Sequence, residues 1–169
     1  GHGIDKTPAS DITMETYVNQ LLAILDGQPE KVVLVGHSFN GITVSRVAEL
    51  RPKKIDQLVY LTAFVFPNGA SFYDAVKGVP DSKAVEHFFL SEDQTEAFVK
   101  AEELQNAFAH DIPSEDFNQA IAYIVPEPAA PLGYKLEVTD AVFGKIPKYY
   151  IECTDDRAIP ISAQRSMYD

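Results

Sequence analysis

The chain of 169 residues carries 14 lysines and arginines against 25 aspartates and glutamates, a formal net charge of −11 at pH 7. Apolar residues make up 46% and charged residues 23%, the composition of a folded globular protein rather than a disordered or fibrous one. Nucleic-acid binding depends on clustered Lys and Arg side chains that neutralise phosphates, so this acidic chain is not expected to bind nucleic acid. The length suits one domain with a substantial core.

No membrane or secretory segment is expected. The longest nearly continuous apolar run, Leu58 to Phe66, is far shorter than the ~20 residues that span a bilayer. The first residues contain neither the basic nor the apolar region of a signal peptide. A single cysteine, Cys153, cannot form an internal disulfide, which suits a reducing compartment, so we expect a cytoplasmic protein.

The first part of the chain alternates between helical and strand-like patterns. Apolar residues at helical spacing predict an amphipathic helix between Thr13, a candidate N-cap, and Gly27. A continuous β-branched run at 31–35 predicts a strand covered on both faces. A helix over 39–50 and a second strand over 57–64 complete a strand–helix–strand unit. The fold class is therefore α/β.

The pattern changes between residues 67 and 145 to short pieces rich in Phe, Glu and Asp. Ser91 followed by Gln94 resembles a capping box, and a second helix is expected after Ser114. The stripe of apolar residues that predicts the first of these helices is Ala97, Ala101, Leu104 and Phe108. This segment is interpreted as a helical insertion.

The segment most informative about chemistry joins the first strand to the following helix and reads Val35-Gly36-His37-Ser38-Phe39-Asn40-Gly41. A serine at this junction, with glycine two residues before it, is the sequence form of a nucleophile elbow, a strained turn that exposes the hydroxyl. The helix start places the Phe39 backbone N–H where an oxyanion would develop. Asn40 departs from the Gly-x-Ser-x-Gly pattern, since the glycine is delayed to Gly41. The alternative is a plain strand-to-helix turn, because the glycines and lysine of nucleotide-binding loops are absent.

A nucleophilic serine needs a base, and the base needs an orienting acid. Asp155 and Asp156 follow a third predicted strand over 148–153, where α/β-hydrolases carry this acid, and a helix is expected after Pro160. We assign the acid to Asp156. The alternative is that the two aspartates only cap a turn.

Four blocks resemble the plant methylesterase and hydroxynitrile lyase family of α/β-hydrolases and its bacterial esterase relatives: Gly1-His2-Gly3, the Val-Gly-His-Ser elbow, residues 61–67 and residues 150–160. The last block is similar to the family's Cys-Thr-acidic-Asp-x-x-Ile-Pro pattern, whose aspartate falls on Asp156. The resemblance implies a mostly parallel sheet flanked by helices, with a helical cap. Esterase members have histidine before the nucleophile, as His37 here, whereas lyase members tend to have glutamate.

The resemblance also implies a division of the chain. Residues 1–66 form the first core segment with the elbow, residues 67–145 the cap, and residues 146–169 the second core segment with the acid. Phe64 and Phe66 would lie near the acyl pocket.

The family's catalytic histidine lies in a loop near the C-terminus, and its second oxyanion donor lies upstream. We therefore expect this chain to be a fragment, inactive by itself, that lacks both. The four histidines that it contains do not fit the catalytic role: His2, His37, His87 and His110.

The expected function is that of a serine hydrolase that cleaves a small hydrophobic carboxylic ester, such as an aryl or methyl ester. Ser38 and Asp156 would act with a histidine beyond residue 169, and no metal or organic cofactor is expected. The expected partner is the small ester, with neither nucleic acid nor membrane. The alternatives are a carbon–carbon lyase, a non-catalytic small-ligand receptor on the same fold, and a degenerate fragment without activity.

Overall fold

The computed structural model describes residues 2–79 and 81–168, and its main sheet contains three parallel strands in the order β1–β2–β6. Helix α2 connects β1 to β2, which confirms the predicted strand–helix–strand unit. The strands are β1 (Val32–Ser38), β2 (Ile55–Ala63) and β6 (Lys148–Ile151). Gly1, part of the first block of resemblance, and Asp169, the last residue of the second core segment, lie outside the described residues.

Helices flank this sheet. The main ones are α1 (Met14–Asp26), α2 (Asn40–Leu50) and α8 (Ile161–Tyr168), with short 3-10 turns η1 (Ala9–Asp11) and η2 (Pro52–Lys54). Thr13 precedes α1 as predicted, and its N–H donates to the Thr16 hydroxyl at 3.1 Å. Among residues 2–79 and 81–168, no helix is both long and apolar enough to cross a membrane.

One face of the main sheet is open. The prediction that the first strand is covered on both faces is wrong for the described part of the chain. Leu58 and Tyr60 are fully buried on the side of α2. The apolar side chains that are 49% to 56% exposed are Val33, Val35, Tyr149 and Ile151. The apolar run therefore predicts the strand correctly, but it does not predict that one face of the strand is exposed.

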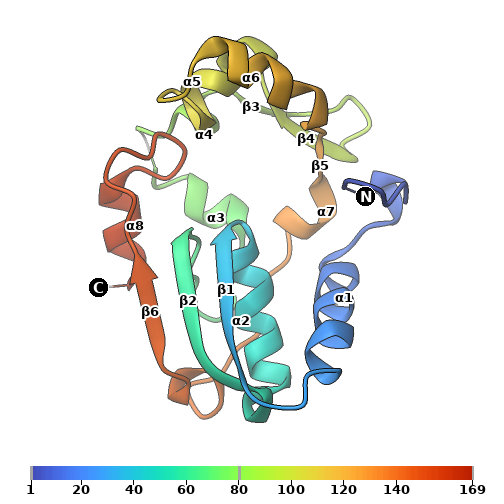
Figure 1. The fold of residues 1–169 in the computed structure, drawn as a ribbon, viewed down its shortest axis with the longest axis vertical. Coiled ribbons are helices and arrows are strands. Elements are labelled where there is room, and N and C mark those ends of the chain that lie inside the picture. Colours follow the sequence, from blue (N-terminus) through green and yellow to red (C-terminus); the bar gives the residue numbers. More distant parts are fainter. Residues whose placement is uncertain (1, 80, 169) are drawn as a thin grey trace.

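The cap lies beyond the carboxyl ends of β1 and β2 (Figure 1). Its elements, with those that lead into and out of it, are α3 (Phe72–Val76), α4 (Lys83–Glu86), β3 (Phe88–Leu90), β4 (Glu96–Val99), η3 (Ala101–Glu103), α5 (Leu104–Phe108), α6 (Ser114–Ala120), η4 (Ile121–Tyr123), β5 (Glu127–Pro128), α7 (Ala129–Leu132) and η5 (Phe143–Lys145). Short helices dominate it, as predicted.

The cap also contains a small antiparallel sheet, in the order β3–β4–β5, that the sequence analysis did not predict. The prediction that Ala97 starts a helical stripe is wrong, because Ala97 lies in β4 and pairs with Leu90 on one side and Glu127 on the other. The later part of the stripe, Leu104 and Phe108, lies in α5 as expected.

The Ser91-to-Gln94 pattern forms the hairpin turn between β3 and β4 rather than a helix N-terminus. The Ser91 hydroxyl accepts hydrogen bonds from the N–H groups of Thr95 and Glu96 at 3.1 and 3.0 Å. Gln94 has a φ of 59°, which ends any helical path there. Serine bonds to neighbouring backbone in turns as well as in helix caps, so the pattern alone does not separate the two.

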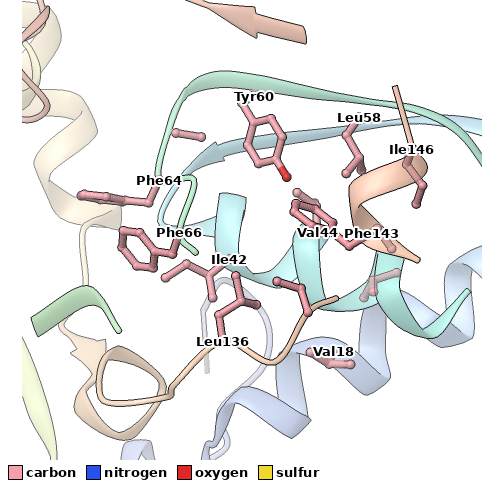
Figure 2. Packing of buried hydrophobic residues seen from close by; sticks show 14 of the residues in the cluster. Val18, Ile42, Val44, Leu58, Tyr60, Phe64, Phe66, Leu136, Phe143 and Ile146 are labelled. Atoms are coloured by element: carbon pink, nitrogen blue, oxygen red, sulfur yellow. The ribbon is translucent and has the colours of Figure 1, made fainter. Parts of the chain in front are cut away.

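The hydrophobic core lies between α2 and the covered face of the sheet (Figure 2). Ile42 and Val44 of α2 meet the buried side chains of β2 there. Leu136 and Phe143, from the end of the 67–145 segment, complete the same core. This segment therefore contributes to the core as well as to the cap.

A buried polar pair joins α2 to β2 inside this core. The Ser45 hydroxyl donates to the Gly41 carbonyl at 2.7 Å and lies 2.7 Å from the Tyr60 hydroxyl. Since the single Ser45 proton is directed to Gly41, Tyr60 is the donor between the two hydroxyls. Burial raises the pKa of Tyr60 to about 12, so its hydroxyl keeps the proton.

We expect Ser45→Ala to cost about 1–3 kcal/mol of stability, because it leaves the buried Tyr60 hydroxyl without its acceptor. Tyr60→Phe removes the donor but leaves Ser45 bonded to Gly41, so its expected cost is smaller, about 1 kcal/mol. Urea denaturation of both variants and the wild type measures the difference. A larger loss in Tyr60→Phe than in Ser45→Ala would contradict this direction of donation.

Candidate active site

Ser38 occupies a strained turn at the carboxyl end of β1. Its φ of 52° lies in the left-handed region, which non-glycine residues rarely adopt. The register of β1 against β2 shifts between His37 and Ser38, and the Ser38 carbonyl accepts from the Phe64 N–H at 3.1 Å. These are the features of the predicted elbow, since the turn projects the serine side chain away from the sheet.

The two glycines of the elbow are required by close backbone contacts. A Cβ at Gly36 would lie 2.7 Å from Val44 Cγ2, and a Cβ at Gly41 would lie 2.1 Å from the Phe64 carbonyl oxygen. Asn40, at the position where the Gly-x-Ser-x-Gly pattern has glycine, is exposed. The tight approach in this chain is therefore at Gly41, which explains why a side chain is tolerated at Asn40.

Asp156 is held in a fixed orientation by the loop after β6. Its Oδ1 accepts hydrogen bonds from the N–H groups of Ala158 and Ile159 at 2.8 and 2.9 Å. Its Oδ2 accepts a short hydrogen bond from the Thr62 hydroxyl. Asp155 differs sharply, since its side chain is 99% exposed. The geometry of a positioned acid belongs to Asp156.

Thr62 was not predicted as a functional residue. It has a φ of 35°, an outlier for a β-branched side chain, and it is buried at the end of β2. Such strain at the end of a strand is typical of functional sites. Tyr150 supports the same strand end, because its hydroxyl donates to the Ala63 carbonyl at 3.0 Å. Burial raises the pKa of Tyr150 above its usual value, so this hydroxyl stays a donor.

The cap anchors the loop that carries Asp156. The Ser82 hydroxyl, at the start of α4, donates to the Ala158 carbonyl at 2.6 Å, and the Lys83 N–H donates to the Arg157 carbonyl at 2.8 Å. The Arg157 guanidinium donates to Asn106 Oδ1 of α5 at 2.7 Å. Two cap helices thus contact the loop that carries Asp156, a link with no signal in the sequence pattern.

Ser38 borders an apolar cavity of about 410 Å³ between the cap and the sheet. Aromatic side chains from both parts line it: Phe39, Phe64, Phe72, Phe88, Phe98 and Phe108. Phe66, also predicted near the acyl pocket, does not line this cavity and packs behind Phe64, with ring centroids 5.5 Å apart. A cavity of this size and lining suits a small hydrophobic ligand.

Ser38 also borders a second, more polar cavity of about 580 Å³, which Asp156 and Thr62 line as well. The structure therefore brings the predicted nucleophile and acid to one cavity. His37 and His110 line it too, and the buried His110 Nε2 has no hydrogen-bond partner among the described residues.

Within the described residues, the hydrogen bonds to the Asp156 carboxylate come from Thr62, Ala158 and Ile159 and not from any of the four histidines. His2 lies 3.3 Å from a Glu127 oxygen, and His87 lies beside Glu86 and Glu103. His110 lies 3.9 Å from an Asp155 oxygen.

Comparisons with known proteins agree on one family. Residues 1–168 match the family described as "Alpha/beta hydrolase family". The "Putative methylesterase 11, chloroplastic" of Arabidopsis thaliana is 34% identical over 178 residues, which cover 99% of this chain and 46% of that protein. The "Pyrethroid hydrolase" of Sphingobium wenxiniae is 30% identical over 165 residues, 94% of this chain and 59% of that protein. The chain spans about half the length of the curated relatives it matches.

The likeness extends to three dimensions. A solved structure of a pyrethroid hydrolase from Sphingobium faniae JZ-2 has a TM-score of 0.83 at 28% identity, with 97% of this chain and 67% of that chain covered. Sheet and cap are therefore included in the same superposition.

The close approach of Gly41 to the Phe64 carbonyl can be tested by its effect on stability. We expect Gly41→Ala to destabilise the fold by about 1–3 kcal/mol or more, because the new Cβ must displace the Phe64 carbonyl. Gly78→Ala is the matched control, since its nearest foreign atom is 3.6 Å from the new Cβ. Its expected effect is within about 0.5 kcal/mol. Thermal and urea unfolding of the two variants measure both effects, and equal stabilities would contradict the contact.

Proposed function

Because this chain belongs to the alpha/beta hydrolase family, we propose that its protein is a serine esterase that hydrolyses small hydrophobic carboxylic esters. The observation that carries the proposal is the position of Ser38, on a strained elbow between an apolar cavity and a polar cavity that contains Asp156. The apolar cavity offers room for the substrate, and the polar cavity offers the acid and room for a base.

The proposed chemistry is acyl transfer in two steps. Ser38 Oγ attacks the ester carbonyl and passes its proton to a histidine from outside residues 1–169, while Asp156 orients that histidine. The Phe39 N–H donates to the oxyanion, with help from the positive end of the α2 dipole. The alcohol leaves with the proton from the histidine. Water then attacks the acyl-enzyme, releases the carboxylic acid and returns the proton to Ser38.

The relatives support ester cleavage as the reaction class. Two of them are named a methylesterase and a pyrethroid hydrolase. His37, in the position before the nucleophile, is consistent with the esterase branch of the resemblance rather than with the lyase branch. The aromatic lining of the cavity favours an aryl or other apolar acyl group over a charged one.

Replacing Ser38 by Ala in the protein of full natural length tests the nucleophile. Turnover of a chromogenic short-chain ester should fall by at least about a thousandfold. The midpoint of thermal unfolding should stay that of the wild type. Ser10→Ala, an exposed serine of η1, is the control and should keep wild-type turnover. Ester turnover retained in Ser38→Ala would place the nucleophile elsewhere, and cyanide release from mandelonitrile without ester turnover would favour the lyase.

Replacing each of the two neighbouring aspartates in turn tests which of them is the acid. Asp156→Asn should lower kcat/KM on the order of a thousandfold or more, because the base loses its orienting charge. Asp155→Asn should stay close to wild type, since that side chain is 99% exposed. Steady-state kinetics on one ester measure both effects. A larger loss in Asp155→Asn would reassign the acid.

A further inference from the structure

One acidic residue, Glu127, lines the apolar cavity. Among the described residues that line it, Ser38 and Glu127 carry the polar side chains and the others are apolar. Ser38 lies at the end of β1 on the core side, whereas Glu127 lies in β5 on the cap side (Figure 1). The Glu127 side chain is 32% exposed, so its carboxylate is stabilised by solvent as well as by its polar partners.

Two groups from the N-terminal part of the chain hold Glu127 in place. The Tyr17 hydroxyl, in α1, donates to Glu127 Oε1 at 2.7 Å, and His2 Nε2 lies 3.3 Å from Oε2. Burial and the bond to Glu127 raise the pKa of Tyr17 above its usual value, so Tyr17 remains a donor. Pairing of Glu127 with Ala97 in the small cap sheet fixes its backbone. The carboxylate therefore does not swing freely into solvent.

We infer that Glu127 selects the acyl group of the substrate: it disfavours an acyl group that ends in a carboxylate and favours one that ends in a hydrogen-bond donor such as a phenol. The inference rests on the proposed esterase function and names its substrate class. A second anion in the same apolar cavity is repelled by the Glu127 carboxylate and loses its own hydration. Each carboxylate oxygen accepts about two hydrogen bonds, so an acceptor position remains beside Tyr17 and His2 for a donor on the substrate.

The competing explanation is that Glu127 only ties the cap to the core through Tyr17. In that case its removal would weaken the binding of all ligands alike. Selection by charge predicts instead that the ratio of affinities changes between ligands that differ only at their polar end. The test therefore compares ratios and does not depend on turnover.

The ligands are benzylacetone, its para-hydroxy derivative and its para-carboxylate derivative. These ketones offer a carbonyl to Ser38 and Phe39 but contain no ester bond to hydrolyse. Titration calorimetry on the protein of full natural length should give at least about tenfold weaker binding of the carboxylate than of benzylacetone, about 1.4 kcal/mol. The para-hydroxy ligand should bind about threefold more tightly than benzylacetone, the modest gain of one hydrogen bond.

In Glu127→Gln, which keeps the shape and removes the charge, the carboxylate penalty should shrink to about threefold or less, a loss of at least about 0.7 kcal/mol of discrimination. Glu96→Gln is the matched control. Glu96 lies in the same small sheet but does not line the cavity, so it reports the effect of net charge alone and should keep the full penalty. Glu127→Ala also removes the charge and should shrink the penalty in the same way, which provides a second test if Glu127→Gln does not fold.

Three results would overturn the inference: equal binding of all three ketones by the wild type, an unchanged carboxylate penalty in Glu127→Gln and Glu127→Ala, or loss of the penalty in Glu96→Gln with Glu127 intact. Absence of ketone binding would also overturn it, because the cavity would then not be the ligand site. Failure of the Ser38→Ala test leaves these affinity ratios untouched, so failure of the esterase proposal and failure of this inference are distinguishable.

Discussion

The contact between the start of α2 and the end of β2 determines the geometry of the whole site. A Cβ at Gly41 would meet the Phe64 carbonyl oxygen at 2.1 Å and the Ala63 side chain at 3.1 Å, so helix and strand approach as closely as backbones allow. The Phe64 N–H bonds to the Ser38 carbonyl across the same junction. Because the two backbones are fixed against each other, Ser38 is kept in its positive φ conformation and the Phe39 N–H is placed beside it.

The end of β2 connects this elbow to Asp156, the proposed acid. The Thr62 hydroxyl donates to Asp156, the Ala63 carbonyl accepts from the Tyr150 hydroxyl, and Phe64 forms part of the apolar cavity wall. Three consecutive residues thus contact Asp156, the neighbouring strand and the apolar cavity. A parallel strand order of β1–β2–β6 makes this possible, since the carboxyl ends of neighbouring strands meet at one edge.

The sequence predicted the parts of the structure that depend on short-range patterns. The α/β-hydrolase fold class is confirmed, and so are α1 with Thr13 before it and the βαβ unit that contains the elbow. Periodicity and turn residues determine these elements locally. The choice of Asp156 over Asp155 came from the motif and stays a prediction; the structure adds that two backbone N–H groups of the same loop hold the Asp156 carboxylate.

The parts that were missed depend on contacts between distant residues. The Ser91 turn has the same residues as a helix cap, and only pairing of β4 with β3 and β5 distinguishes the two. Glu127 has no motif: it lines the apolar cavity and accepts a hydrogen bond from Tyr17, which lies 110 positions away in the sequence. Similarly, the β-branched run of β1 does not reveal that one of its faces is open in the described residues.

The arrangement of cavities around Ser38 couples the cap to the chemistry. Phe108, Ala158 and Ile159 line both the apolar and the polar cavity, so they form the partition at which Ser38 stands. Ala158 is itself held by the Ser82 hydroxyl of the cap, and its N–H in turn holds Asp156. A shift of α4 would therefore move a wall of the apolar cavity together with the loop that holds the Asp156 carboxylate. The cap in this fold contacts both cavities beside Ser38, because the same short loop serves as cavity wall and as support for Asp156.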